Sequence, residues 1–331
     1  MTVAVLGAGS WGTTLANLLA HKDVPVRLWA YEPEVVESIN ARHVNDLYLP
    51  DSPLHSGITA GGNAAEVVAG VAAVVAVTPS HVARSVVAPL RDVIAPGTPV
   101  VLATKGIETD TLELMHEVFR ECLPEARLTV LSGPSFAKEV YQGQPTAVVA
   151  ASEDQATAEE VQALFSTDRF RVYTNRDVIG TELGGSLKNV IAIASGILQG
   201  LGLGNNPRAA LLTRGLAEIT RLGVAMGADP LTFAGLAGVG DLILTATGPL
   251  SRNLTLGRAL AEGIGLEEYR RTHRTVAEGV NTARAAVALG KKLEVELPIT
   301  AKVAQILFEG KPPRETISEL MERDLKAEHW Q

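Results

Sequence analysis

Lys188 stands in a segment that is almost wholly apolar or small, residues 184–200 (GGSLKNVIAIASGILQG). Burial disfavours the charged form of a lysine and can lower its pKa by about 3–5 units. A lysine whose pKa approaches neutrality is suited to general acid–base chemistry. The segment equally allows a lysine that reaches water from the edge of a helix, so by itself it favours neither interpretation.

Asp241 is the one charged residue in a second apolar stretch, GVGDLILT at 238–245. A carboxylate close to Lys188 would fix the position of its ammonium group and oppose the effect of burial on its pKa. The preceding glycines also allow Asp241 to cap the start of a helix. The two roles are compatible, and we predict that Asp241 is the partner of Lys188.

A third polar group follows the turn TGPL, where Ser251, Arg252 and Asn253 precede a helical segment. Ser251 can cap this helix, and the free N–H groups of a helix start together with a guanidinium bind anions, phosphate above all. The alternative is an ordinary capped helix with an exposed arginine. We expect an anion site here.

The chain begins with the pattern GxGxxG, which places Gly7, Gly9 and Gly12 around Ser10 and Trp11. A predicted strand precedes the motif and a predicted helix follows it. In this context the three glycines allow a tight turn, close approach of a pyrophosphate and close packing of helix on strand. The motif therefore predicts a dinucleotide site, against the alternative of a glycine-rich turn without a ligand.

The second predicted strand ends in LWAYEPE, where a carboxylate would normally hold the adenosine ribose. Ala30 occupies the expected position, followed by Tyr31 and Glu32. Glu32 can bind the ribose or can be a solvated loop residue. No arginine stands there to receive a 2′-phosphate, so the choice between NAD and NADP stays open.

Three other strand ends carry polar groups: VTPSH (77–81), ATKGIE (103–108) and LSGPSF (131–136). In an open parallel sheet, ligands bind outside the carboxyl ends of the strands. Lys105 is the cation among these loops and can hold an anionic substrate. Gly133 and Ser135 can donate hydrogen bonds from backbone or hydroxyl, although both also fit a simple turn.

The elements that must position these residues change character along the chain. Short β-rich segments alternate with helical ones up to about Asn175, and this alternation is typical of a parallel, doubly wound sheet. The predicted strands lie at 3–6, 24–29, 71–77, 100–103, 128–131, 146–150 and 170–173. Helical periodicity then dominates at 178–200, 208–226, 230–238, 252–262, 276–290, 298–308 and 313–327.

We therefore predict an α/β fold with a Rossmann-type, mostly parallel sheet over residues 1–177. An all-helical second domain follows over residues 178–331. No linker or repeat separates the two parts, so they should pack closely and meet near Lys188.

Composition limits the classes of partner. The net charge of −8 argues against nucleic-acid binding, although an anionic small molecule can still bind in a locally positive pocket. The longest apolar run, about residues 67–77, is too short to cross a membrane, and the N-terminus lacks a secretory pattern. One cysteine forms no internal disulfide, and the seven scattered histidines suggest no metal. We expect a cytoplasmic protein.

Seven motifs in order carry a resemblance that spans nearly the whole chain. They are GAGSWGTTLA (7–16), ATKGIE (103–108), SGPSFAKE (132–139), GGSLKNVIAI (184–193), GVGDLILT (238–245), SRN (251–253) and VAEG (276–279). Together they closely resemble the bacterial-type NAD(P)-dependent glycerol-3-phosphate dehydrogenase family. The resemblance implies reversible hydride transfer that interconverts dihydroxyacetone phosphate and sn-glycerol 3-phosphate, the latter used in phospholipid synthesis.

The resemblance also implies roles residue by residue. It assigns Lys188 as the proton donor and acceptor of the reaction. The positions that match substrate contacts are Lys105, Gly133, Ser135, Asp241, Ser251, Arg252 and Asn253. Those that match cofactor contacts are Ser10, Trp11, Tyr31, Lys105, Ala137, Arg252, Val276 and Glu278. Tyr31 departs from the His or Arg often found in relatives, which leaves a preference for NADPH undecided.

Two other functions compete with this interpretation. A sister dehydrogenase on the same fold would act on a hydroxyacid or sugar acid but would not need the SRN block. A nicotinamide-binding regulator without turnover would have no use for a lysine in an apolar pocket backed by a carboxylate. A homodimer is compatible with an enzyme of this type, although no segment predicts the interface.

Overall fold

Short segments rich in Val, Leu and Ala form an eight-stranded sheet in the first half of the chain. The structure is a computed structural model that describes residues 1–273, 277–325 and 327–328. The strands are β1 (Val3–Leu6), β2 (Val26–Trp29), β3 (Ile58–Gly61), β4 (Ala73–Ala76), β5 (Pro99–Leu102), β6 (Arg127–Ser132), β7 (Thr146–Ala151) and β8 (Phe170–Asn175).

The strand order is β3-β2-β1-β4-β5-β6-β7-β8, and every neighbouring pair is parallel except β6 and β7. The prediction of a mostly parallel sheet is therefore confirmed. All seven predicted strands are present, with ends that differ by up to two residues. The pattern did not predict β3, because ITAG is short and its last three residues are only partly buried or exposed.

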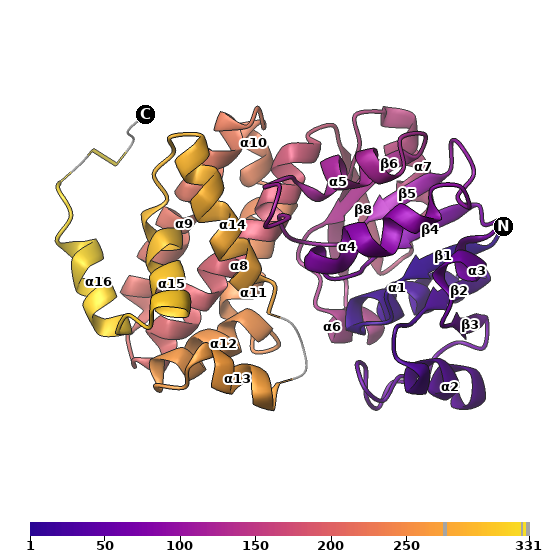
Figure 1. Cartoon of the computed structure of the whole chain (residues 1–331), viewed down its shortest axis with the longest axis horizontal. Coiled ribbons are helices and arrows are strands. Elements are labelled where there is room, and N and C mark those ends of the chain that lie inside the picture. Colours follow the sequence, from indigo (N-terminus) through magenta and orange to yellow (C-terminus); the bar gives the residue numbers. More distant parts are fainter. Residues whose placement is uncertain (274–276, 326, 329–331) are drawn as a thin grey trace.

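Helices cover both faces of this sheet (Figure 1). Val3 and Val5 of β1 point to the face packed by α1, α2, α6 and α7, whereas Ala4 and Leu6 point to the face packed by α3, α4 and α5. These helices are α1 (Ser10–Ala20), α2 (Pro33–Arg42), α3 (Ala64–Val68), α4 (Ser80–Val87), α5 (Met115–Cys122), α6 (Ala137–Tyr141) and α7 (Gln155–Phe165), with a short 3₁₀ turn η1 (Ala88–Leu90).

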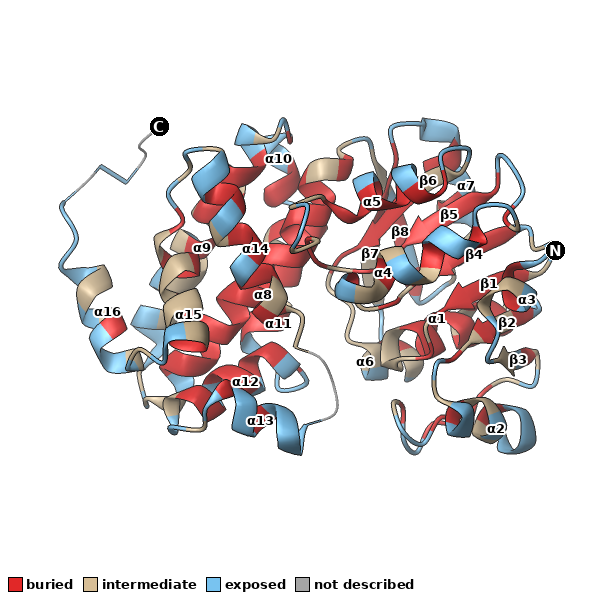
Figure 2. Cartoon of the chain, in the orientation of Figure 1, coloured by how far each residue is buried: buried red, intermediate tan, exposed pale blue. Residues whose placement is uncertain are grey.

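The second half is helical, as predicted, and is built around α8 (Val178–Gly200). Of the 23 residues of α8, 20 are buried, and Figure 2 shows this helix buried along most of its length. It packs against α9, α11, α12 and α14. The remaining helices are α9 (Asn205–Ala225), α10 (Pro230–Phe233), α11 (Asp241–Thr247), α12 (Arg252–Ala261), α13 (Leu266–Thr272), α14 (Gly279–Lys292), α15 (Pro298–Glu309) and α16 (Pro313–Met321).

The helical half departs from the predicted segments in three places. The segment 230–238 divides into α10 and a π-helical turn, η2 (Leu236–Gly240), because glycines at 235, 238 and 240 interrupt the regular helix. Helices α11 and α13 were not predicted. The last helix ends at Met321, short of the predicted residue 327.

The stretch Pro230–Thr247 is apolar and long enough to cross a membrane by length and composition alone. In the structure it is not one regular helix, since it comprises α10, η2 and α11. Each of these pieces packs on α8, and Asp241 lies buried within the stretch. The stretch thus has the character of a core segment of the helical half.

Candidate active site

Three charged side chains meet where the carboxyl ends of β5 and β6 face the helical half. Asp241, at the start of α11, accepts a hydrogen bond from the Lys188 ammonium through Oδ1. Its Oδ2 accepts one from Lys105 Nζ at 2.8 Å. Thr245 Oγ1 donates to Oδ1 at 3.3 Å. The structure therefore brings together Lys188, Asp241 and Lys105, which lie far apart in the sequence.

Lys188 reaches this position because α8 approaches its neighbours very closely. A Cβ at Gly184 would overlap the carbonyl of Ala237 in η2, and one at Gly185 would lie 2.5 Å from Ser132 Oγ at the end of β6. The glycines before Lys188 thus contact protein backbone and side chain. Lys188 itself is 6% exposed, so the alternative of a lysine that reaches bulk water is wrong.

Burial and charge act in opposite directions on this group. The pKa of Lys188 is lowered to about 7, chiefly by burial, against the raising effect of Asp241 and with a further lowering effect of Lys105. Burial alone would raise the pKa of Asp241, but the two ammonium groups outweigh that effect and hold it below its usual value. The site therefore contains a carboxylate beside a lysine, and the lysine can gain or lose a proton near neutral pH.

The predicted anion site lies at the start of α12. Ser251 is its N-cap, and its Oγ accepts a hydrogen bond from Leu254 N at 3.2 Å. Arg252 is the first helical residue and is exposed to solvent. Asn253 is buried, and its amide oxygen accepts from Gly279 N while its amide nitrogen donates to Asn189 Oδ1, both at 3.0 Å. Asn253 thus joins α12, α14 and α8.

Gly133 and Ser135 lie in the loop after β6. The φ of Gly133 is +139°, and its carbonyl oxygen accepts from Ser135 Oγ at 3.0 Å and from Lys105 Nζ at 3.5 Å. A Cβ at Gly133 would come within 2.9 Å of Val148 Cα. This loop therefore lies beside Lys105, and only glycine fits at position 133.

The glycine motif has the geometry expected of a dinucleotide loop. Gly7 has a φ of +115°, and a Cβ at Gly12 would overlap the Gly7 carbonyl oxygen. Gly9, by contrast, has open space where its Cβ would lie. No side chain caps α1, and its first turn holds no acidic residue. The start of α1 is thus free to receive the phosphates of a dinucleotide.

Two other residues predicted to contact the cofactor, Tyr31 and Ala137, follow strands at the same edge of the sheet. Tyr31 follows β2 and is 81% exposed, while Glu32 accepts a hydrogen bond from the Tyr48 hydroxyl at 2.6 Å. Ala137 begins α6, and its carbonyl oxygen accepts from Thr14 Oγ1 of α1 at 3.2 Å. Val276 lies outside the described residues.

Glu278 comes from the helical half but reaches the start of α4. Its Oε2 accepts a hydrogen bond from Ser80 Oγ at 2.8 Å. Burial raises the pKa of Glu278, against the opposing effects of Ser80 and the nearby Arg252. The structure thus places Glu278 and Arg252 close to one another.

Three polar residues beside the site were not singled out from the sequence. Ser80 lies within the motif VTPSH, Asn189 directly follows Lys188, and Thr245 ends the motif GVGDLILT. Thr245 lies four residues after Asp241, and this helical spacing could have indicated their contact. The pairings of Ser80 with Glu278 and of Asn189 with Asn253 join distant segments, so no local pattern pointed to them.

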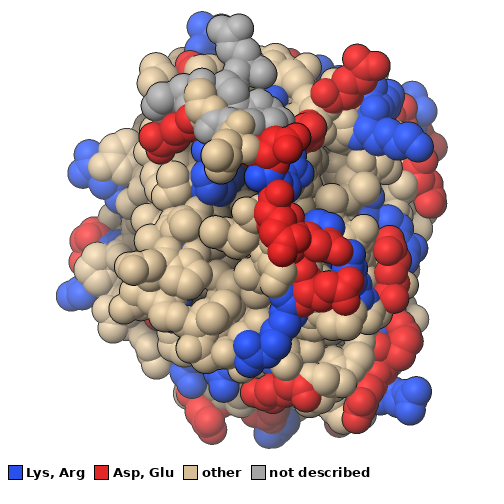
Figure 3. All heavy atoms as spheres, turned by 90° about the vertical axis from the view of Figure 1, so that its left-hand side faces the viewer, with Lys and Arg blue, Asp and Glu red and all other residues tan. Residues whose placement is uncertain are grey.

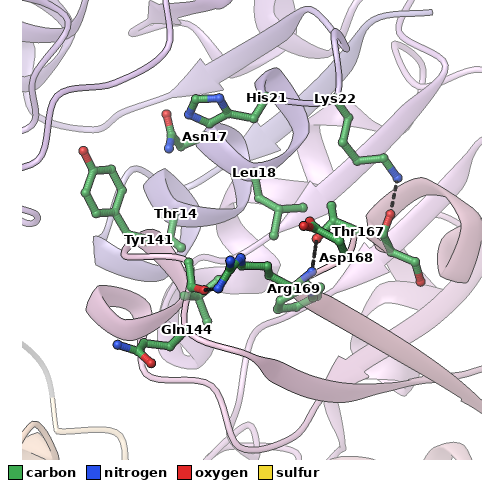
Figure 4. Close-up of a pocket in the computed structure, with 14 residues that line it drawn as sticks. Thr14, Asn17, Leu18, His21, Lys22, Tyr141, Gln144, Thr167, Asp168 and Arg169 are labelled. Atoms are coloured by element: carbon green, nitrogen blue, oxygen red, sulfur yellow. Dashed lines mark hydrogen bonds between the residues drawn. The ribbon is translucent and has the colours of Figure 1, made fainter.

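A cavity of about 450 Å³ opens elsewhere, between α1, α6 and the loop before β8 (Figure 4). The Lys22 ammonium beside it donates to the carbonyls of Ala163, Leu164 and Ser166. The Tyr141 hydroxyl donates to the Pro53 carbonyl at 2.6 Å. None of the predicted catalytic or substrate residues lines this cavity.

Family models match both halves of the chain. The model described as the N-terminus of NAD-dependent glycerol-3-phosphate dehydrogenase matches residues 2–158, and the corresponding C-terminus model matches residues 177–318. The chain belongs to this family. It is 57% identical over 329 residues to glycerol-3-phosphate dehydrogenase [NAD(P)+] of Geobacter metallireducens, covering 98% of each chain. Identity to the protein of that name from Geobacter sulfurreducens is 56% over 331 residues, covering 99% of each.

Solved structures agree with this family membership. A glycerol-3-phosphate dehydrogenase from Coxiella burnetii is similar with a TM-score of 0.94 and 41% identity, over 97% of this chain and 99% of that one. D-mandelate dehydrogenase is similar with a TM-score of 0.66 at 13% identity, over 97% of this chain and 100% of that one, which shows a shared fold alone. The fold is therefore common to several dehydrogenases. The match of both halves to the glycerol-3-phosphate dehydrogenase family models distinguishes this chain from the sister enzymes.

Proposed function

We propose that this protein catalyses the reversible, NAD(P)-dependent interconversion of dihydroxyacetone phosphate and sn-glycerol 3-phosphate. The observation that carries the proposal is the contact of two lysines with one buried carboxylate, at the same edge of the sheet as an open dinucleotide loop. The product glycerol 3-phosphate would supply phospholipid synthesis. The close relatives bear the name glycerol-3-phosphate dehydrogenase [NAD(P)+].

Lys188 is the proposed acid and base. A bound nicotinamide would supply a hydride to C2 of the ketone or accept one from C2 of the alcohol. As C2 is reduced, negative charge develops on its oxygen, and the Lys188 ammonium neutralises and protonates that oxygen. In the reverse direction the neutral amine takes the hydroxyl proton. Asp241 holds the ammonium in place and Lys105 adds positive charge beside it.

Arg252 is the proposed anchor for the phosphate of the substrate. A guanidinium at the start of α12 combines a bidentate donor with a favourable helix dipole. A remote charged group held in this way orients the carbonyl, so that binding energy contributes to the rate of the chemical step. Ser251 and Asn253 shape this site; in the structure their polar groups bind other parts of the protein.

The cofactor is proposed to lie across the dinucleotide loop, with Gly7, Gly9 and Gly12 allowing its phosphates to approach α1. Ser10, Trp11, Tyr31, Ala137, Val276 and Glu278 complete the proposed set, together with Lys105 and Arg252. We also propose that residues 1–177 form the cofactor domain and residues 178–331 the substrate domain. Lys188 belongs to the second and Lys105 to the first.

One prediction about partners, the lack of nucleic-acid binding, follows from charge. Figure 3 shows the end of the molecule formed by the helical half, where blue and red residues alternate along one side and most of the rest is uncharged. Such a face offers no continuous basic track for nucleic acid. We further propose that the protein does not insert into a membrane. A homodimer is compatible with an enzyme of this type, and sedimentation of the purified protein distinguishes a dimer from a monomer.

The function is tested by adding dihydroxyacetone phosphate to purified protein with NADH or NADPH and following nicotinamide absorbance. We expect oxidation of at least one cofactor, and the ratio of the two rates gives the preference that Tyr31 leaves open. A hydroxyacid or sugar-acid substrate pair serves as the control for the sister enzymes. Folded protein that turns over neither cofactor with dihydroxyacetone phosphate would disprove the proposal.

A further inference from the structure

A second buried ionisable pair lies outside the site just described. Glu182 of α8 accepts a hydrogen bond from the backbone N–H of His116 at 2.9 Å through Oε1. Its Oε2 lies 2.6 Å from Nδ1 of the same histidine, within hydrogen-bond distance. Glu182 is 4% exposed and His116 is 7% exposed. A buried carboxylate with two such bonds to one residue fixes the geometry between their elements.

The two elements belong to different halves of the molecule. His116 is the second residue of α5, which covers the sheet, whereas Glu182 is the fifth residue of α8. One helical turn further along α8, Ser186 Oγ donates to the carbonyl oxygen of Gly106 at 3.3 Å. Since Gly106 directly follows Lys105, α8 holds the Lys105 loop at both ends, through Ser186 and through the start of α5.

The loop between these two contacts is itself closed. A β-bridge pairs Ile107 with Leu114, so the segment from Lys105 to His116 is a compact unit. Both Ile107 and Leu114 are buried in the core of the helical half, beside Leu183 and Leu187 of α8. A change at Glu182 is therefore transmitted to Lys105 through a short, packed connection.

The position of Lys105 matters because it is the only member of the charged triad from the first half. Lys188 and Asp241 both lie in the helical half, on α8 and α11, which pack directly together. If the two halves separate slightly, the Lys188–Asp241 pair stays intact while Lys105 withdraws from it. Withdrawal removes a like charge and admits water, and both changes raise the pKa of Lys188.

We propose that Glu182 is a positioning residue for the reaction, which acts through His116 and the start of α5 to hold Lys105 against the Asp241–Lys188 pair. The effect on turnover rests on the proposed function. The effect on the triad is independent of it, because it concerns the distance between groups of this chain.

The test compares Glu182→Gln and His116→Gln with the wild-type protein by titrating Lys188 directly. The ¹³Cε resonance of labelled lysine reports its protonation, and Lys188→Met assigns the signal. We expect the pKa of Lys188 to rise by about one unit in Glu182→Gln. His116→Gln keeps the backbone contact of the carboxylate and should give a smaller rise. The pH at which kcat/KM for ketone reduction begins to fall should move upward with it.

Glu218→Gln is the matched control. Glu218 is also buried, and its carboxylate accepts the backbone N–H groups of Ile299 and Thr300 at the start of α15, neither of which belongs to the triad or to the Lys105 loop. It should lose stability as Glu182→Gln does but leave the Lys188 titration unchanged.

Folded Glu182→Gln whose Lys188 titrates as in the wild type would overturn the proposal, as would an equal rise in Glu218→Gln. If Glu182→Gln does not fold, His116→Gln decides in the same way. Wild-type protein without turnover would refute the proposed function, yet the titration would still support or overturn the role of Glu182.

Discussion

Asp241→Asn is the most informative change in the triad, because it removes the one negative charge between two ammonium groups. The shape of the side chain is kept, and an amide oxygen can still accept a hydrogen bond. The attraction that raises the pKa of Lys188 is lost, while burial and Lys105 still lower it. We therefore predict that the pKa of Lys188 falls further below its present value.

The size of this fall follows from the burial of the pair. Removing one partner of a buried ion pair costs about 3–5 kcal/mol, and the lower end applies here because a lysine can release its proton. One pKa unit corresponds to about 1.4 kcal/mol, so 3 kcal/mol amounts to about two units. The pKa of Lys188 would thus move from about 7 to a value near 5 in the variant.

The assay is the pH dependence of kcat/KM in both directions. For the wild type, ketone reduction needs the ammonium and falls as pH rises through about 7, whereas alcohol oxidation needs the amine and rises over the same range. In Asp241→Asn both inflections should move down by about two units. At any one pH the losses in the two directions must stay linked, because a mutation leaves the reaction equilibrium unchanged.

Asp177→Asn provides the control, since Asp177 caps the start of α8 without touching an ammonium group, and asparagine caps equally well. Its inflections should match those of the wild type. An Asp241→Asn enzyme whose inflections stay near pH 7 would refute the assignment of Lys188 as the titrating group.

Three other changes probe the same site. Lys188→Met should lower kcat by about 10²–10⁴ or more while cofactor binding, measured by fluorescence titration, is retained; near-normal turnover would contradict its role. Arg252→Ala should raise KM for dihydroxyacetone phosphate about 10–100-fold, because it removes a charged hydrogen bond worth about 1.5–3 kcal/mol. Arg258→Ala on the same helix serves as the control and should leave this KM unchanged. Gly185→Ala places a methyl group against Ser132 and should lower the free energy of unfolding in urea by about 1–3 kcal/mol. The kcat should also fall, because Lys188 shifts. An unchanged midpoint of urea unfolding would argue against close contact at this glycine.

Local patterns were sufficient to predict most of the elements. Alternating short strands and helices predicted the sheet because each segment carries its own β-branched or helical periodicity. The reversed direction of β7 was not predicted, since its pairing with β6 depends on the path of the chain between them. Likewise η2 replaces a predicted helix, because closely spaced glycines leave the local conformation to the packing against α8.

The site was predictable in its residue types but not in most of its contacts. Lys188 was conspicuous because a cation is unusual in an apolar segment, and Asp241 for the same reason. Lys105 and Asp241 are 136 residues apart in the sequence, so no local pattern could predict their ion pair. The helix start with its arginine predicted an anion site at Ser251, Arg252 and Asn253, and the resemblance assigned these residues to the substrate. The structure adds that Asn253 binds Asn189 and Gly279.

The burial of α8 has a consequence for how this protein can change. The helix that carries Lys188 also fills the centre of the helical half, and several of its glycines lie against the backbone of other elements. Mutational tolerance along α8 should therefore be low, even at positions far from the reacting atoms. New substrate ranges would have to arise from the strand-end loops and the start of α12, so a directed-evolution library is best confined to those segments.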